Sequence, residues 1–395
     1  MVMAAAMANT GQRPPFLPGL GGLRGLAALA VLVGHGVAWL TPLPQTPDLY
    51  EPFARLTRCG LSAFFVLSGF VLTYNHGAAM AAGELPFGRF AVARLARLYP
   101  VYLLTLGLSA GLALLKHGPG SFGGPGHLLA FASLTQTWFL VPSWPQIFPL
   151  AWAVSVEVFF YLAFPATAWL LARARTPRAA LWLLLAALAA VLALDGLGAR
   201  LWPQLFTAYA ARHPEWTGTP GELAALLFQW LFYSSPYLRI FDWLMGAAAA
   251  RFFLLKPSMP RNLDILAALC LAGLLLVPLP KDSFLLQVVA QNVLYAPFLT
   301  ALLLAFAARP RAFLSARRLG AVSAASLSIY LVQTWTLGVF AGPPATGWPE
   351  ALLRLAAGLA ATFAVGLAVA RFIEHPAARW VMMVMQRKSL RRPGA

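Results

Sequence analysis

The chain alternates between long apolar segments and short segments that collect proline, glycine and basic residues. A helix needs about 20 mostly apolar residues to cross the hydrocarbon core of a bilayer. The segments that meet this requirement are 22–41, 59–76, 97–116, 149–171, 179–197, 236–254, 263–279, 286–308, 318–341 and 351–372. The pattern therefore predicts an all-α, polytopic bundle of about ten transmembrane helices.

Two further apolar stretches, 126–142 and 222–234, are short or interrupted by polar residues, and we interpret them as interfacial or re-entrant pieces. Both fall in the longest outer loops. One of these loops, 117–148, carries Trp138 and Trp144 and almost no charge. Its rings either form an aromatic belt at the interface or cover a site, where they stack on a sugar or another amphipathic acceptor.

The composition agrees with a membrane protein, because 60% of the residues are hydrophobic and only 10% are charged. Soluble domains carry roughly a quarter charged residues. The net charge is +17. With the N-terminus inside, 21 of the 29 Lys and Arg residues fall on the cytoplasmic side and 8 on the outer side, as the positive-inside rule requires. The basic charge is thus a topology signal, and we do not expect nucleic acid as a partner.

The same pattern divides the chain into three parts. We expect a cytoplasmic N-terminal segment, 1–21, a transmembrane domain, 22–380, and a basic, disordered cytoplasmic tail, 381–395. Both termini are then cytoplasmic. The expected location is the bacterial cytoplasmic membrane, which the chain crosses many times.

Arg24 and His35 are the first ionisable side chains inside a predicted span. They are eleven residues apart, which corresponds to three helical turns plus about 20°, so they share one face. The rise of roughly 16 Å puts Arg24 at the cytoplasmic interface and His35 near the midplane. This arrangement suits a site in which Arg24 binds an anion at the mouth and His35 is a titratable base deeper inside. The structural alternative is that His35 only bonds a neighbouring helix.

Glu157 lies eight residues into the segment that enters from the outer side, so we expect it at about the depth of His35. An isolated carboxylate there would take up a proton, and a histidine partner would resolve that cost. Tyr161, four residues later, shares the face of Glu157, whereas Ser155 lies on another part of the helix. The alternative to a catalytic role is that Glu157 forms an ion pair between helices that is purely structural.

Further polar groups accompany the apolar segments. Arg94 and Arg97 precede the third span on the cytoplasmic side, where their guanidinium groups suit a phosphate clamp or anchor the chain to anionic lipid. Arg239 and Asp242, three apart on the sixth span, suit a local ion pair. Gln333, deep in the ninth span, can donate and accept hydrogen bonds but cannot titrate.

Several of these residues stand in motifs that follow one another along nearly the whole chain. The motifs are Leu23-Arg24-Gly25 with His35, Ser68-Gly69-Phe70, Arg94-x-x-Arg97-x-x-Pro100, Trp152-x-x-Ser155-x-Glu157, Arg239-Ile-Phe-Asp242 with Gly246, Ser326-x-Ser328-Ile-Tyr330-Leu331 and Glu374-x-Pro376. Together they resemble acyltransferase family 3, membrane proteins that O-acylate carbohydrates, cell-wall glycans and some secondary metabolites. Two positions depart from the family pattern. Gln333 stands where many members carry histidine, and Asp242 stands where glutamate is frequent.

The resemblance implies an acyl-CoA donor, often acetyl-CoA, and a hydroxyl acceptor on a carbohydrate or glycosylated molecule. The expected partners are thus acyl-CoA, this acceptor and membrane lipids, with no tightly bound cofactor and no metal. The residues expected to act are His35 and Glu157 in catalysis, Arg24, Arg94 and Arg97 in binding acyl-CoA, and Trp152, Ser155, Tyr161, Arg239, Asp242 and Gln333 in supporting the site or binding the acceptor.

In the expected mechanism His35, oriented by Glu157, is the general base for the acceptor hydroxyl or carries the acyl group briefly. Ser155 or Gln333 would donate to the thioester oxyanion. A different function class, a proton-coupled secondary transporter, also uses buried ionisable residues. A different acceptor class is a small natural product such as a macrolide. A scaffold without chemistry would leave the buried ionisable side chains unexplained.

Overall fold

The computed structural model describes residues 15–118, 124–143, 147–280, 282–309, 311–315, 317–343 and 345–390. Its helices are α2 (Pro18–Leu40), α3 (Pro47–Ala81), α4 (Phe87–His117), α5 (Pro125–Ala132), α6 (Ala151–Arg173), α7 (Pro177–Arg200), α8 (Trp202–Arg212), α9 (Pro220–Gln229), α10 (Pro236–Leu255), α11 (Leu263–Leu276), α12 (Phe284–Gln291), α13 (Ala296–Ala308), α14 (Arg317–Ala324), α15 (Ser326–Phe340), α16 (Trp348–Val369) and α17 (His375–Leu390). Two π turns, Trp230–Ser234 and Ala370–Glu374, precede α10 and α17. No strand occurs in this described part, so the predicted all-α class is confirmed.

Seven helical stretches among the described residues are long and apolar enough to cross a membrane, with α12 and α13 counted together as Phe284–Ala308, or eight if the bent pair α14–α15 forms one span. All ten predicted segments are helical, but a count of ten spans stays a prediction. The helix α11 has only 14 residues. The helix α10 carries Arg239, Asp242 and Arg251 within 20 residues.

Two predicted spans are interrupted, and the limits of the two predicted terminal segments also differ from the structure. The predicted span 286–308 is interrupted between α12 and α13, and the predicted span 318–341 bends by 70° between α14 and α15. The tail expected to be disordered from residue 381 instead continues α17 as far as Leu390, while residues 391–395 lie outside the described part. Most of the predicted segment 1–21 also lies outside it, and α2 begins at Pro18.

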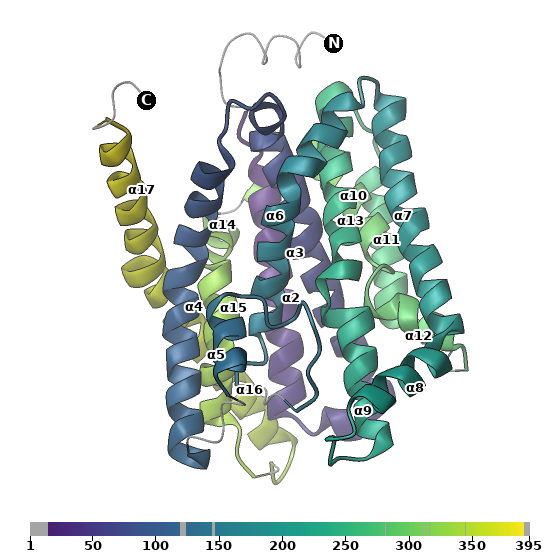
Figure 1. Ribbon diagram of the computed structural model, residues 1–395, viewed down its shortest axis with the longest axis vertical. Coiled ribbons are helices and arrows are strands. Elements are labelled where there is room, and N and C mark those ends of the chain that lie inside the picture. Colours follow the sequence, from purple (N-terminus) through teal and green to yellow (C-terminus); the bar gives the residue numbers. More distant parts are fainter. Residues whose placement is uncertain are drawn as a thin grey trace.

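At the centre of the bundle α3 packs along α2 and α10 (Figure 1). Two glycines permit the contact between α3 and α10. A Cβ on Gly69 would meet the carbonyl oxygen of Trp243 at 2.0 Å, and a Cβ on Gly246 would meet that of Val66 at 1.9 Å. Small residues let membrane helices approach this closely, and dispersion between the packed surfaces then stabilises the pair. The motif glycines thus have a packing role.

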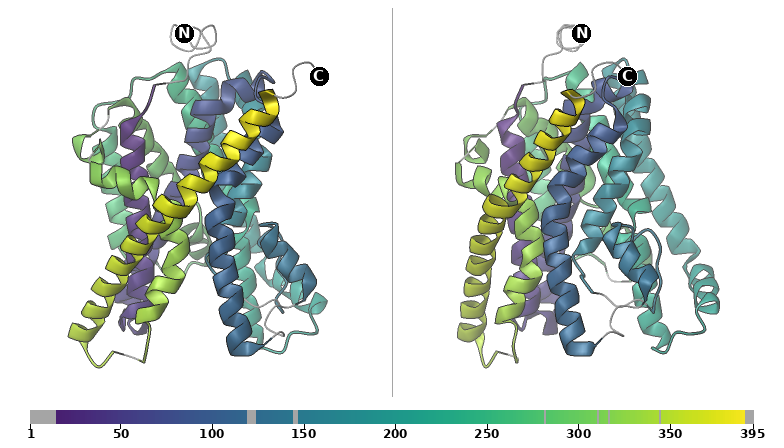
Figure 2. Two further views of the ribbon diagram at one scale, coloured as in Figure 1. Left: turned by 90° about the vertical axis from the view of Figure 1, so that its left-hand side faces the viewer. Right: turned by 60° about the vertical axis from the view of Figure 1, so that its left-hand side comes forward.

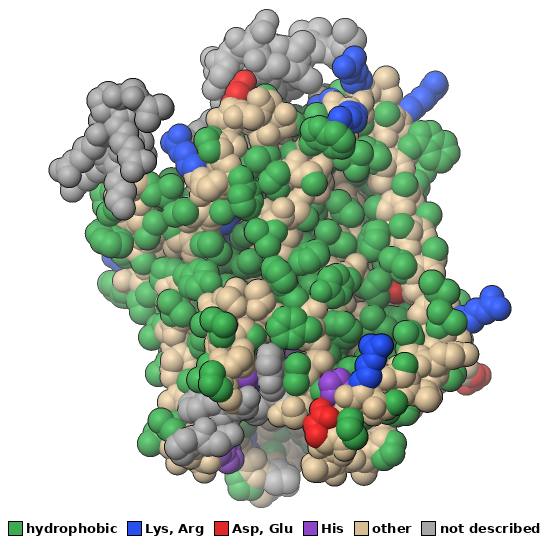
Figure 3. Space-filling model, in the orientation of Figure 1, with side chains coloured by type: hydrophobic (Ala, Val, Ile, Leu, Met, Phe, Trp, Pro, Cys, Tyr) green, Lys and Arg blue, Asp and Glu red, His purple; other side chains and the backbone are tan. Residues whose placement is uncertain are grey.

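The outside of the bundle is apolar, as expected for a lipid-facing surface. Apolar side chains cover the middle of the face in Figure 3, and basic side chains stand mainly at its upper and lower edges. The side chains of Trp182 and Leu353 are each 70% exposed. On another side, α16 continues through a π turn into α17, which crosses α4 on the outside of the bundle (Figure 2).

Candidate active site

A cavity of about 330 Å³ lies among α2, α3, α4, α6 and α15. It begins at Pro15–Leu17, where Phe16 is 86% exposed, and ends inside the bundle at Leu61 and Tyr330. Its wall is apolar apart from one group of polar side chains. Those side chains include Arg24, Ser68, Asn75, Arg94, Arg97, Glu157, Tyr161 and Ser326. Five of the residues selected from the sequence therefore meet at one cavity.

Glu157 is held in this cavity by hydroxyl groups. The hydroxyl of Tyr161 donates to its Oε1 at 2.7 Å, and that of Ser68 donates to the same oxygen at 3.5 Å. The guanidinium of Arg24 interacts electrostatically with both Glu157 and Tyr161. The i, i+4 relation of Glu157 and Tyr161 thus acts as expected from the helix period. Ser68 stands in a motif in the sequence, but its contact with Glu157 could not be inferred from spacing.

Arg94 and Arg97 are positioned by groups outside the cavity. Arg94 Nη2 lies 3.0 Å from His76 Nε2, and its Nε atom is buried without a hydrogen-bond partner among the described residues. Arg97 Nε lies 3.5 Å from Oε1 of Glu374, a fully buried carboxylate whose Oε2 accepts from Ser328 at 2.6 Å. The two arginines of the expected phosphate clamp therefore line the same cavity as Arg24.

His35 does not line this cavity, and its expected pairing with Glu157 is wrong. No hydrogen bond or ion pair joins the two within the described part of the chain. The imidazole stacks on Trp39, with ring centroids 5.5 Å apart, and interacts with the side chain of Gln333. His35 Nδ1 and Gln333 Oε1 are both buried without a hydrogen-bond partner among the described residues.

The separation follows from where α6 begins. The depth of Glu157 was counted from residue 149 at the outer surface, but α6 starts inside the bundle, at the fully buried Ala151. The carbonyl of Leu150 accepts from the hydroxyl of Tyr330 at 3.0 Å, which fixes this start. Glu157 consequently lies near the level of Arg24, while His35 lies roughly 16 Å further along α2.

Ser155 is not available as an oxyanion donor. Its hydroxyl donates to the carbonyl of Leu134 at 2.7 Å and accepts from that of Thr137 at 2.8 Å. A hydroxyl has a single proton to donate, so the expected catalytic role is not supported. Ser155 instead anchors the segment before α6, in which Leu134 is fully buried with a φ of 60°. The Trp138 ring of this segment packs edge-on against Phe159, and Trp144 lies outside the described residues.

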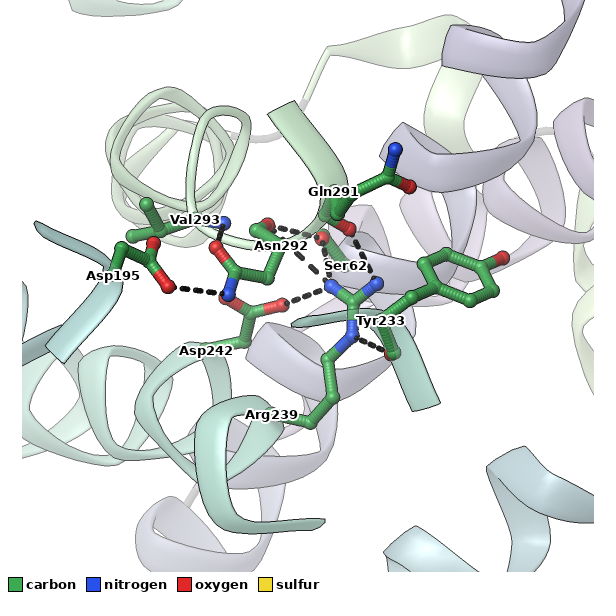
Figure 4. Close-up of polar contacts among 8 residues, drawn as sticks. All are labelled: Ser62, Asp195, Tyr233, Arg239, Asp242, Gln291, Asn292 and Val293. Carbon is green, nitrogen blue, oxygen red and sulfur yellow. Dashed lines mark hydrogen bonds and ion pairs between the residues drawn. The ribbon is translucent and has the colours of Figure 1, made fainter. Parts of the chain in front are cut away.

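Arg239 and Asp242 form the expected ion pair, at 3.3 Å, but within a much larger network (Figure 4). Arg239 is fully buried, and its Nε donates to Tyr233 O and its Nη2 to Gln291 O, both at 2.6 Å. The ring of Tyr233 lies 4.8 Å from the guanidinium, and that of Trp152 lies 6.0 Å away. Trp152 therefore packs beside this network and does not line the cavity.

The network also contains residues that the sequence reading missed. Arg239 Nη1 lies 3.4 Å from Ser62 Oγ and from Asn292 O, and Asn292 Nδ2 donates to Asp195 Oδ1 at 3.0 Å. Asp195 stands alone among the apolar residues of α7, and this isolated carboxylate was the signal that could have found it. The network joins α3, α7 and α10 to the break between α12 and α13.

Among the described residues, no three His, Cys, Asp or Glu side chains gather as they would around a metal ion. The cavity instead offers guanidinium groups, one carboxylate and hydroxyls. This set suits an anion, with a titratable carboxylate close to it.

The family model of the acyltransferase domain (acyltransferase family 3) matches residues 17–371. The chain belongs to this family. It is 33% identical over 155 residues to "Acyltransferase MdmB" of Streptomyces mycarofaciens, a match that covers 38% of each chain. It is 37% identical over 91 residues to "Protein 2 in picA locus" of Rhizobium radiobacter, which covers 23% of this chain and 42% of that protein. The matches thus span less than half the length of these relatives. No solved structure matches.

Proposed function

We propose that this acyltransferase moves an acyl group, acetyl in the first instance, from acyl-CoA to a hydroxyl of a carbohydrate or glycosylated acceptor. The observation that carries the proposal is the cavity in which Arg24, Arg94 and Arg97 meet Glu157. It begins at the end of the bundle that the distribution of basic residues assigns to the cytoplasm. CoA is present on that side, and its phosphates match guanidinium forks.

Two arginines of the donor site have guanidinium donors without a hydrogen-bond partner in the described part of the protein. Arg24 makes no hydrogen bond within the described part, and Arg94 Nε is buried without one. A buried donor without a partner is costly, so a bound phosphate would stabilise both side chains. The apolar wall, with Phe64, Phe65 and Leu72, suits the rest of an extended acyl-CoA arm.

The inner end of the cavity leads toward His35. Tyr330 stands at that end, and its carbonyl accepts from Nε2 of Gln333 at 2.9 Å, one turn further along α15. Gln333 in turn interacts with His35. A thioester carried past Tyr330 would therefore meet the imidazole. Gln333, and not Glu157, is then the side chain that orients His35.

The reaction needs a neutral imidazole. His35 would take the proton of the acceptor hydroxyl as its oxygen attacks the thioester carbonyl, and the departing CoA thiolate would regain that proton from the imidazolium. Transfer through a short-lived acyl-histidine is the alternative order of steps. Both routes use the same side chain and yield the same ester and free CoA.

The acceptor is proposed to arrive from the opposite, outer end. Trp39 stacks on His35 and is 37% exposed, so its free face offers a platform for a sugar ring. We place a glycan hydroxyl first. A glycosylated natural product such as a macrolide is the second choice, since the same platform would accept its sugar.

Binding of CoA to the purified protein tests the donor site. Arg94→Gln with Arg97→Gln should weaken binding at least about a hundredfold, since each lost contact with a charged group costs roughly 1.5–3 kcal/mol. The matched control is Arg175→Gln with Arg178→Gln, which removes the same charge from two exposed positions, one between α6 and α7 and one in the first turn of α7. Equal affinity in both double variants would contradict the assignment of the cavity to CoA.

Turnover tests the chemistry. A folded His35→Ala protein should bind CoA like the wild type and transfer no acetyl group to a panel of candidate acceptors. Uptake of a solute into vesicles, driven by a proton gradient and independent of acyl-CoA, would favour the transporter class instead.

A further inference from the structure

A second cavity, a groove of about 500 Å³, lies on the other side of Arg97, between α4 and α17. Its lining consists of Arg97, Arg371, Glu374, His375, Ala378 and Arg379. Arg371, His375 and Arg379 are four residues apart, so they form one stripe along this face, and all three are exposed. The donor cavity and this groove therefore share one wall residue, Arg97.

The positive charge of the groove is not balanced by the protein. Glu374 is its acidic member, and that carboxylate is fully buried and already engaged by Arg97 and Ser328. Arg371 and Arg379 make no ion pair within the described part of the chain. The Arg371 guanidinium contacts the adjacent Phe372 ring, and Arg379 Nε bonds the carbonyl of His375 at 3.3 Å. Both cations thus remain available to an anion.

The helical stretch that ends at the groove is long enough to cross a bilayer. From Trp348 at the start of α16 to Arg371 the chain is helical over 23 steps, a rise of roughly 35 Å. The hydrocarbon core is about 30 Å thick, so this stretch has the length to pass through the core between Trp348 and Arg371. Beside the stripe, Phe372 is 71% and Trp380 63% exposed, and both rings face outward from the bundle. The surroundings are therefore apolar on the lipid side and cationic at the groove.

We propose that this groove binds the phosphate of an anionic membrane phospholipid, held by Arg371 and Arg379 with Arg97 behind them. The exposed rings of Phe372 and Trp380 would contact its acyl chains. A diffusible anion gains nothing from those rings, which is why the lipid is the preferred occupant. Two cations near an anionic headgroup give an affinity about tenfold or more above that for a zwitterionic lipid.

The test is retention of phosphatidylglycerol by the full-length protein, measured by native mass spectrometry after exchange into detergent with phosphatidylglycerol or phosphatidylcholine. Wild type should retain one phosphatidylglycerol and no phosphatidylcholine. Arg371→Gln with Arg379→Gln should lower this occupancy at least tenfold. The matched control, Arg175→Gln with Arg178→Gln, should retain the lipid. None of these measurements needs acyl-CoA or an acceptor. Their outcome is therefore independent of whether the proposed reaction is correct.

Three results would overturn the proposal. Equal retention by wild type and Arg371→Gln with Arg379→Gln would place the lipid elsewhere. An equal loss of lipid in the control variant would mean that the total positive charge at the interface, and not this groove, retains the lipid. Displacement of the lipid by inorganic phosphate at millimolar concentration would show that the groove takes a free anion without using the apolar rings.

Discussion

The hydroxyl of Tyr161 donates a 2.7 Å hydrogen bond to Oε1 of Glu157, one turn earlier on α6, and Arg24 acts on both groups across the cavity. The carboxylate is thus tied to the cavity that Arg24, Arg94 and Arg97 line. Its position supports a role in organising the arginines rather than in contacting the imidazole.

Glu157→Gln should lower acetyl transfer about tenfold to a hundredfold, because it removes the charge that opposes Arg24 and weakens a charge-assisted hydrogen bond. Tyr161→Phe keeps the carboxylate and should cost tenfold or less. Initial rates with radiolabelled acetyl-CoA in proteoliposomes measure both. Tyr209→Phe, on α8, is the control, since the Tyr209 hydroxyl donates to the carbonyl of Leu140 and does not line the cavity. A larger loss for Tyr161→Phe than for Glu157→Gln would contradict this order.

Gln333→Leu should lower kcat strongly while leaving the affinity for CoA within about twofold of wild type. The reason is that Gln333 interacts with His35 but does not line the donor cavity. Thr336→Val, on the same helix, removes a hydroxyl that bonds Thr362 at 2.6 Å and should leave both quantities unchanged. Steady-state kinetics and CoA binding on the same preparations separate the two effects, and a parallel rise in the dissociation constant of CoA would refute the assignment.

The sequence predicted the helical class and selected five residues that line the first cavity, because both results depend on local spacing. An apolar run of 20 residues reports a helix directly, and Glu157 with Tyr161, or Arg94 with Arg97, share a face by helix period alone. The expected contact between His35 and Glu157 depended instead on how deep each residue lies along the bundle axis. Depth could not be read from the sequence, because the anchor of Ser155 on Leu134 draws the start of α6 into the bundle.

Other features depend on contacts between distant segments. The carbonyls of Gln291 and Asn292 reach Arg239 only because the predicted span 286–308 is broken there. Asn292 then brings Asp195 into the network. Hydropathy averages over such a break, so it reports one span where the structure has two helices and a polar turn.

Arg239→Met should destabilise the protein by about 3–5 kcal/mol, since it leaves Asp242 buried without its partner. The double variant Arg239→Met with Asp242→Leu should recover part of this loss, because no uncompensated charge remains. Thermal unfolding in detergent, followed by tryptophan fluorescence, measures both variants. Additive losses would show that the 3.3 Å ion pair contributes no coupling.

Gly69→Ala should destabilise the contact between α3 and α10, because the new methyl group would lie 2.0 Å from the carbonyl oxygen of Trp243. Backbone cannot yield as a side chain can, so the helices must separate, at a cost of about 1–3 kcal/mol. Gly107→Ala is the matched control on α4, since a Cβ there meets nothing within 4 Å. That substitution should leave the melting temperature unchanged or raise it slightly, as alanine is the better helix former. A fall of the same size in both variants would contradict the assignment of the loss at Gly69 to close packing between α3 and α10.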